Sequence, residues 1–435
     1  MAPPDASHHY PPESWADRFR SRWVILGFLM AICFLSHFNR ASITSAGDER
    51  IMAQYQISPA QMGAIYSSFL VVYTLFMIPG GLFLDWKGPR MALGLMGIGS
   101  AAFCGFTGMV GLGFLSWMPM VTALFVVRAT MGLVSTPLHP SAARAIGNWF
   151  PPVEAGLANG LVTGASVVAY AVVHPVFGGL IDRLDWPYSF LTTGAVTFLL
   201  AVAWWVIGRD RPAAGIDEPL AVPAALRERT SGVMTVLASR PMIFLTLSYA
   251  AVGYFQYLFF YWLHYYFESI LHLEKHLSRN YSALPNLAMA AGMPVGGWLL
   301  GWWERRQGPV RRHWFPMAGM SLSAFCLLLA IASTKIGWTV TFLTLALGVL
   351  GLTESCFWTT SVRLGGNRGG TTAAIMNTGG NGIGLLAPLL TPIIGTYLGW
   401  SWGLGVGAVV GLAGALCWFG IRVDQFPPEA DPTQG

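Results

Sequence analysis

Two arginines lie inside long apolar stretches of the sequence, where a charged side chain is costly. Arg40 and Arg128 are each surrounded by the hydrophobic and small residues of an expected membrane helix. A cation at the bilayer centre costs about 2.5–3.5 kcal/mol on insertion scales, so it is usually paired or faces a water-filled cavity. A guanidinium group binds a carboxylate through two parallel hydrogen bonds. The two residues therefore predict an anion site, with the alternative for Arg128 that it only ties its helix to backbone carbonyls.

Titratable side chains inside the same apolar stretches are candidates for moving a proton. Glu354 lies four residues before Trp358, so the two share a helix face, and an acid within a membrane helix is a functional candidate by default. His37 precedes Arg40 by three residues, and His139 stands between two prolines. The alternatives are a salt bridge or packing role for Glu354 and satisfaction of a kinked backbone for His139. We expect Glu354, His37 and His139 to be the coupling candidates.

The composition is that of a membrane protein. Of the 435 residues, 54% are hydrophobic and only 10% charged, whereas soluble domains carry about 25% charged residues. The net charge of +5 does not indicate a nucleic-acid partner, because the basic residues lie mostly in short loops between apolar stretches. The cysteines show no metal-ligand spacing, and we expect no metal, cofactor or disulfide framework. They are Cys33, Cys104, Cys326, Cys356 and Cys417.

The apolar stretches divide into twelve segments of the length that crosses a bilayer, about 20 residues each. They lie near residues 22–46, 61–82, 91–114, 118–141, 155–180, 186–208, 241–266, 281–303, 313–334, 338–361, 372–397 and 400–422. We expect an all-α membrane fold of twelve transmembrane helices in two pseudo-symmetric six-helix bundles. The expected units are a tail (1–21), a bundle (22–208), a linker (209–240), a second bundle (241–422) and a second tail (423–435).

The two halves repeat each other, and their charges predict an orientation. The run Gly80-Gly81 to Gly88-Pro89 returns as Gly296-Gly297 to Gly308-Pro309, which starts 216 residues later and is four residues longer. Such a repeat is typical of a duplicated transporter bundle. With the N-terminus inside, most basic residues fall in inner segments, so both termini are expected in the cytoplasm. His174 and His264, near outer helix ends, are expected to serve packing. The outer loops hold only Arg50, Arg183, Lys275, Arg279 and Lys335.

The loop between the second and third expected helices resembles a signature of the major facilitator superfamily. The run from Gly81 through Asp85 and Gly88 to Arg90 is similar to the motif GxxxD(R/K)xG(R/K)(R/K), with Trp86 in place of its first basic residue. In that family the loop stabilises one conformation and does not touch the substrate. The resemblance implies that Gly81, Asp85, Gly88 and Arg90 form such a conformational latch.

The first expected helix resembles one branch of this superfamily, the anion:cation symporters, which include sugar-acid carriers and vesicular glutamate transporters. Residues 34–44, Phe-Leu-Ser-His-Phe-Asn-Arg-Ala-Ser-Ile-Thr, are similar to the segment FxxYxDRxxxS. Similar stretches within residues 58–81, 128–160 and 358–381 extend the resemblance over most of the chain.

This resemblance implies several substrate contacts. Tyr73 corresponds to a tyrosine that sugar-acid carriers use for substrate hydroxyls, and Ser355 matches a contact position. Phe357 replaces a hydroxyl residue, which favours a less hydroxylated substrate than a sugar acid. Asn377 is preferred to Asn381, which is expected to serve packing. With the polar groups of the second half, the expected substrate-binding set is Arg40, His37, Asn39, Tyr73, Arg128, Gln256, Tyr257, Ser355, Trp358 and Asn377.

Two positions depart from the branch pattern. Symporters of this branch have an Asp before the first-helix Arg and a Glu seven residues after the fourth-helix Arg, where this chain has Asn39 and Ser135. Neither residue can carry a proton. We therefore expect anion exchange or potential-driven uniport, and any coupled proton must be carried by Glu354 or His37.

The sequence thus predicts a secondary carrier, not an enzyme, for a small organic anion such as a mono- or dicarboxylate or a sugar acid. It is expected in a cell membrane, of the bacterial inner-membrane kind, as a monomer that works by alternating access. Its other partners would be the lipid bilayer and a proton or an exchanged anion. Two alternatives stay open: efflux of an amphipathic drug or siderophore, and a membrane receptor that does not transport.

Overall fold

The computed structural model describes residues 15–150, 152–210, 239–307, 313–365 and 369–421, and the structural statements below concern this part of the chain. It forms helices joined by short turns. The first half contributes α1 (Trp15–Ala46), η1 (Gly47–Ile51), α2 (Met52–Tyr55), α3 (Pro59–Leu75), α4 (Met77–Gly111), α5 (Met120–Ser135), α6 (Leu138–Trp149) and α7 (Pro152–Ile207). The second half contributes α10 (Arg240–Tyr265), η2 (Tyr266–Ile270), α11 (Lys275–Gln307), α12 (Trp314–Ala332), α13 (Ile336–Gly365), α14 (Gly369–Gly384), α15 (Leu386–Leu398), α16 (Trp400–Cys417) and η5 (Trp418–Gly420).

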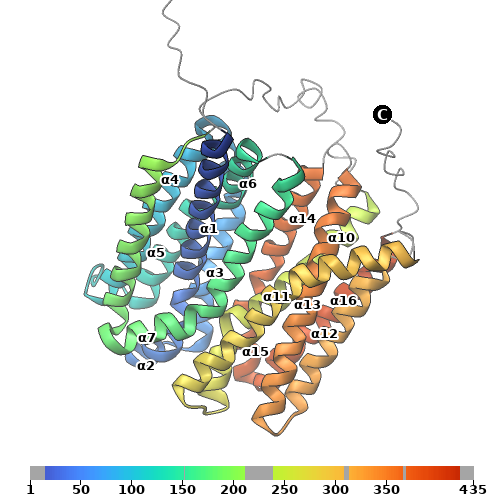
Figure 1. Cartoon of the computed structure of the whole chain (residues 1–435). Coiled ribbons are helices and arrows are strands. Elements are labelled where there is room, and N and C mark those ends of the chain that lie inside the picture. Colours follow the sequence, from blue (N-terminus) through green and yellow to red (C-terminus); the bar gives the residue numbers. More distant parts are fainter. Residues whose placement is uncertain (1–14, 151, 211–238, 308–312, 366–368, 422–435) are drawn as a thin grey trace, which may run out of the picture.

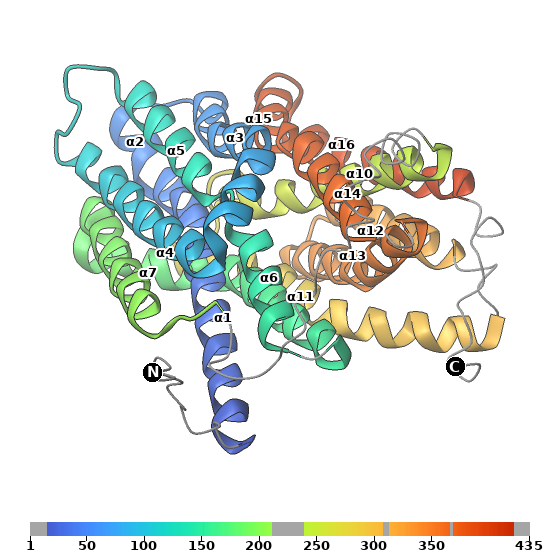
Figure 2. The same ribbon diagram turned by 90° about the horizontal axis from the view of Figure 1, so that it is seen from above.

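The helices form two groups that follow the two halves of the sequence. Figure 1 shows the blue-to-green group beside the yellow-to-red group, and Figure 2 shows the same separation from above. Between the groups, α7 packs along α11, α1 contacts α10, and α3 contacts α14 and α15. The expected unit boundaries stay a prediction, and residues 1–14, 211–238 and 422–435 of the expected tails and linker lie outside the described residues.

Ten helical segments are long and apolar enough to cross a membrane, judged by length and composition. One of them, Leu157–Ile207, has 51 residues and bends at Asp185, whose φ of 62° interrupts α7. Another helix, α3, has 17 residues, slightly fewer than the roughly 20 that cross a bilayer. The chain is therefore a multi-pass membrane protein, and the count of twelve spans stays a prediction.

Local sequence signals explain several helix ends. Ser58 accepts a hydrogen bond from the backbone N–H of Gln61, whose side chain accepts from the Ser58 backbone N–H, a reciprocal arrangement that fixes the start of α3. Pro59 follows at the first helical position, where its missing N–H costs nothing. Gly88 (φ 80°) bends α4, and Gly399 (φ 100°) separates α15 from α16; both angles suit a residue without a Cβ.

The surface of the fold is unlike that of a soluble protein, because large apolar side chains are exposed while several polar ones are fully buried. Large apolar side chains such as Trp117, Val206 and Trp298 are 79%, 77% and 65% exposed, while Asn39 and Arg128 are 0% and 1% exposed. Lipid tails cover the apolar surface, so the polar groups gather between helices, where they find hydrogen-bond partners. The candidate site residues are therefore placed by helix–helix packing.

Glycines set the distance between α11 and α13. A Cβ on Gly296 would run into the carbonyl group of Leu352, and one on Gly292 would approach the carbonyl oxygen of Gly348. Small residues let helix backbones approach in lipid, where no hydrophobic gradient drives helices together. Gly164 of α7 is different, because nothing lies within 4 Å of its Cβ position.

We expect Gly296→Ala to lower the apparent unfolding temperature of the purified protein, because the added methyl group must separate α11 from α13. Overpacking of this kind typically costs about 1–3 kcal/mol. Gly164→Ala is the matched control and should unfold at the wild-type temperature. Equal unfolding temperatures for the two variants would show that the close approach at Gly296 is not a constraint.

Candidate functional site

Arg40 lies in α1 at the boundary between the two halves. Its guanidinium group is buried and donates to the hydroxyls of two tyrosines of α10, Tyr257 (3.0 Å) and Tyr261 (3.3 Å). It also lies 4.9 Å from the ring centroid of Phe69 and 5.8 Å from that of Tyr73, both on α3. Aromatic faces attract a cation, but among the described residues no carboxylate pairs with this guanidinium. Its charge is held only by neutral groups.

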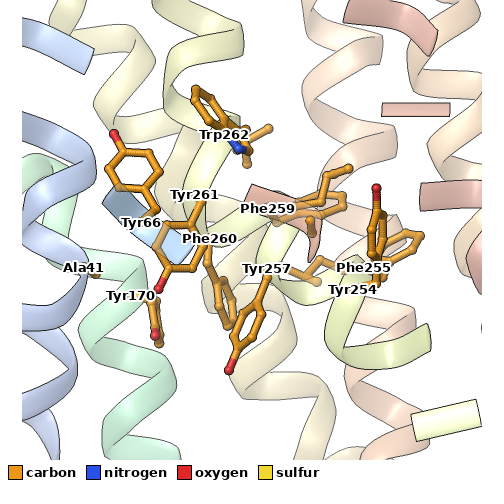
Figure 3. Packing of buried hydrophobic residues seen from close by; sticks show 14 of the residues in the cluster. Ala41, Tyr66, Tyr170, Tyr254, Phe255, Tyr257, Phe259, Phe260, Tyr261 and Trp262 are labelled. Carbon is orange, nitrogen blue, oxygen red and sulfur yellow. The ribbon is translucent and has the colours of Figure 1, made fainter. Parts of the chain in front are cut away.

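Aromatic side chains from both halves surround this arginine. Tyr170 of α7 stacks on Phe260 of α10 with ring centroids 4.1 Å apart, and Tyr66 of α3 lies 5.4 Å from Tyr261. Figure 3 shows these four rings close together, with Tyr257 beside them. The guanidinium group therefore lies where the two halves meet, among aromatic rings and tyrosine hydroxyls.

Arg128 contacts backbone carbonyls, as in the alternative that it only ties its helix to them. From α5 it donates to the backbone carbonyl of Asn39 (3.2 Å) and to that of Arg40. Its Nε has no hydrogen-bond partner in the described structure. In this conformation Arg128 holds the segment of α1 that carries Arg40, and its guanidinium is not directed at a free site in the way expected for a second anion-binding group.

A chain of hydrogen bonds connects Arg40 to α14. The Tyr257 hydroxyl, which accepts from Arg40, donates to the side-chain oxygen of Asn381. The Asn381 amide donates to the backbone carbonyl (2.9 Å) and side-chain oxygen (3.3 Å) of Asn377. Sequence reasoning preferred Asn377 as the contact and assigned Asn381 to packing, yet Asn381 is the direct partner of Tyr257.

Glu354 of α13 is a buried carboxylate held by three neutral donors. It accepts from the Tyr249 hydroxyl (2.6 Å), the Trp358 indole (3.0 Å) and the Gln256 amide (3.4 Å). No ion pair of the described residues includes it, so the salt-bridge alternative does not apply. Ser355 points elsewhere and donates to the backbone carbonyl of Met293 on α11 (3.1 Å).

His37 and His139 lie side by side near Arg40. Their ring centroids are 5.2 Å apart, and His37 Nδ1 lies 2.9 Å from the backbone oxygen of Cys33. The possible ligand atoms of these two histidines and Cys33 lie within 4.8 Å of one another. By distance alone they could hold a metal ion, but the positive charge of Arg40, one turn away on α1, opposes a cation there.

The two positions that depart from the branch pattern hold neutral, hydrogen-bonded groups. The Asn39 amide donates to the Thr197 hydroxyl (2.6 Å), away from Arg40. The Ser135 hydroxyl donates to the backbone carbonyl of Met131 (2.8 Å). Asn39 therefore does not compensate the charge of Arg40 in this structure.

Sequence reasoning missed a group of charged residues at the end of the molecule that holds η1 and η2, the end that the charge pattern assigns to the outside. Arg279 of α11 donates to Glu49 of η1 (2.8 and 2.5 Å) and to Asp182 of α7 (2.5 and 3.1 Å). Nδ1 of His264, on α10, lies 3.3 Å from a carboxylate oxygen of Asp48, on η1. We call these residues, with Arg50, Asp185 and Glu268, the outer ion cluster. The signal in the sequence was the presence of Arg50 and Arg279 among so few outer cations.

A family model described as Major Facilitator Superfamily matches residues 29–386. The chain belongs to the major facilitator superfamily. Among solved structures, a bacterial homolog of the human lysosomal transporter Spinster, in an inward-facing and unoccupied conformation, superposes with a TM-score of 0.79 at 16% identity. The match covers 94% of this chain and 99% of that one, which confirms the superfamily fold.

Relatives of this superfamily member are named as carriers of small organic anions. A protein of Escherichia coli named "Probable L-galactonate transporter" is 25% identical, over 95% of this chain and 92% of its own length. The "Hexuronate transporter" of Bacillus subtilis is 24% identical over 86% of this chain and 89% of its own length. The "Probable sulfoacetate transporter SauU" of Cupriavidus necator is 24% identical over 86% and 87%.

The superfamily loop motif lies in α4 and contacts the end of α7. The backbone N–H of Arg90 donates to the Asp210 carboxylate (2.8 Å), and its guanidinium donates to the backbone carbonyl of Trp205 (2.7 Å). A Cβ on Gly88 would lie 3.1 Å from that carboxylate. Nothing lies within 4 Å of the Cβ position of Gly81, and the side chain of Asp85 lies outside the described part. The role of the motif as a conformational latch stays a prediction.

We expect Tyr257→Phe to raise the KM for the transported anion about 3- to 10-fold with a smaller effect on maximal rate. The change removes one hydroxyl that both accepts from Arg40 and donates to Asn381, and a hydrogen bond contributes about 0.5–1.5 kcal/mol. Tyr397→Phe, at an exposed tyrosine of α15, is the control. Unchanged uptake kinetics in Tyr257→Phe would remove this hydroxyl from the site.

Proposed function

We propose that this protein is a secondary carrier of a small organic anion in a bacterial inner membrane, with twelve membrane spans and both termini in the cytoplasm. The observation that supports it most is the buried Arg40, which has no carboxylate partner among the described residues. A buried cation without an anion is unfavourable, and a transported carboxylate supplies what is missing. The relatives named above are all described by anionic substrates.

The surroundings of Arg40 favour a carboxylate on a short, partly polar body. The planar guanidinium group can bind it through two parallel hydrogen bonds, once it exchanges its tyrosine partners for the substrate. The freed hydroxyls of Tyr257 and Tyr261 then remain beside the anion as hydrogen-bond donors. A mono- or dicarboxylate fits this arrangement, and a sugar acid fits it if its hydroxyls reach Asn377 and Asn381.

The contacts between the halves support alternating access around this site. The outer ion cluster joins η1 and α7 of the first half to α10 and α11 of the second. With these contacts formed, the outer end is closed, and the anion would exchange with the opposite side. Opening the outer end requires the two halves to rock apart, which also separates Arg40 from Tyr257 and Tyr261.

The neutral groups around Arg40 also bear on which ion or gradient drives transport. Asn39 and Ser135 hold no proton, and an uncompensated Arg40 makes the return of the empty carrier costly. We propose that the carrier exchanges anions or works as a uniporter driven by the membrane potential. If a proton is coupled, Glu354 is the best-placed carrier, because its three neutral donors leave its charge without a cation.

We expect Arg40→Ala to abolish uptake of radiolabelled carboxylates into proteoliposomes while the protein level and elution profile stay normal. Arg306→Ala is the matched control, since Arg306 lies near the inner end of α11 against Trp302 and should transport normally. Wild-type uptake by Arg40→Ala would place the anion site elsewhere. Binding of an anion by the wild type without any flux would instead favour a receptor.

The proposed coupling predicts that uptake depends on internal anion or on membrane potential and not on a pH gradient alone. Liposomes with and without internal anion, each with an imposed proton gradient, separate these cases. We expect strong uptake only with internal anion or an inside-positive potential. Uphill uptake driven by the proton gradient alone, and retained in both Glu354→Gln and His37→Gln, would contradict the coupling argument.

A further inference from the structure

The outer ion cluster contains more acids than it can neutralise. Its carboxylates are Asp48, Glu49, Asp182, Asp185 and Glu268, and its permanent cations are Arg50 and Arg279. Arg50 lies 3.7 Å from Asp182 and 4.0 Å from Asp185, at the solvent edge. The buried part is left with three carboxylates and one arginine.

Hydrogen bonding within the buried part shows where the imbalance lies. Arg279 binds Glu49 through two nitrogens and also donates to Asp182, so its one positive charge is already shared between two carboxylates. Asp48 and Glu268 both approach the same nitrogen of His264, Nδ1, at 3.3 and 3.6 Å. That nitrogen has at most one proton to donate. The other ring nitrogen of His264 and one carboxylate oxygen of Glu268 are buried without a hydrogen-bond partner.

These groups are enclosed by residues of both halves. The side chains of Asp48, Glu49 and His264 are 0% exposed, and that of Glu268 is 15% exposed. Carboxylates packed this closely and shielded from water cannot all be ionised. The charged and titratable groups that face Asp48 and Glu268 from the surrounding elements are Glu49, Tyr66, His174, His264, Tyr265, Lys275 and Arg279.

We propose that the closed outer ion cluster binds a proton, shared between the Asp48 and Glu268 carboxylates that approach Nδ1 of His264, and that this proton stabilises the closed outer end. Opening the outer end hydrates these carboxylates and separates η1 from α10, so the open state binds the proton more weakly. By linkage, the state that binds more protons is favoured as pH falls. Acidic external solution should therefore close the outer end.

The position of the cluster makes this proton regulatory and not a driving ion. It enters when the outer end is open and is enclosed when the outer end closes, with Arg40 between it and the opposite side. The proton must therefore return to the side from which it came. This inference goes beyond the proposed function, because it needs the two-state movement of the halves but no particular substrate.

The test measures the outer opening directly, without substrate. Ser116 lies in the turn between α4 and α5 and Thr334 in the turn between α12 and α13, and both are exposed. Spin labels at Ser116→Cys and Thr334→Cys, in a background without the native cysteines, report the distance between the outer ends of the two halves in nanodiscs. We expect the ratio of short to long distances to rise as pH falls from 8 to 5, by at most about tenfold per pH unit for one proton.

Two sets of variants decide whether the cluster causes this response. Asp48→Asn and Glu268→Gln should each flatten the pH dependence, whereas Glu304→Gln, in the pair with Arg363 near the opposite end, should leave it unchanged. Distances in the wild type that do not change with pH would overturn the proposal. A response that survives in both acid variants would also overturn it.

The second set of variants tests the close fit between Arg279 and α7. A Cβ on Gly178 of α7 would run into the guanidinium group of Arg279, whereas nothing lies within 4 Å of the Cβ position of the neighbouring Gly179. Gly178→Ala should displace Arg279 and lengthen the distance between the outer ends at every pH. The control, Gly179→Ala, should behave like the wild type. If Gly178→Ala closes normally with an unchanged pH response, Arg279 does not hold the outer end together. Loss of anion transport would leave all these distance results unaffected, so the two proposals fail independently.

Discussion

The burial of one uncompensated guanidinium group, that of Arg40, is the constraint on which the central arrangement depends. Tyrosine hydroxyls and aromatic faces hold it in place, but none of them carries a negative charge. The cost of a buried charge falls when an opposite charge arrives. In the proposed function, an anion that binds at Arg40 would gain free energy by compensating this charge. The contacts of Arg40 also join α1 to α10 across the two halves. In the proposed carrier, substrate binding and the movement of the halves would therefore act on the same hydrogen bonds.

Arg128 shows how a second buried cation can be satisfied in a different way. Its guanidinium donates to two successive backbone carbonyls of α1, which carry partial negative charge but do not exchange with solvent. Because those carbonyls belong to Asn39 and Arg40, Arg128 fixes the direction in which the Arg40 side chain leaves its helix. Two arginines that look equivalent in the sequence thus have different contacts. Arg40 faces the boundary between the halves, and Arg128 supports the segment of α1 that carries Arg40.

The sequence predicted the superfamily and much of the helical order, because long apolar segments and the loop motif from Gly81 to Arg90 depend on local patterns. It could not predict which polar group meets which. Asn377 and Asn381 are one helical turn apart, and only the packing of α14 against α10 decides that Asn381 contacts Tyr257. The outer ion cluster was missed for the same reason, since its members come from residues 48 to 279 and meet only when the two halves pack together.

The two charged regions differ in the sign of their unbalanced charge. Around Arg40 there is an excess of positive charge, which an entering anion relieves. In the outer ion cluster there is an excess of acids, which repels an anion unless a proton is bound. In the proposed mechanism, an anion that approaches the open outer end must pass these carboxylates before it reaches Arg40. Neutralising part of the cluster would therefore do more than close the outer end, because it would also lower the electrostatic barrier on the proposed path to Arg40. External acidity would then act on two steps in opposite directions, easing entry while shortening the time for which the outer end stays open.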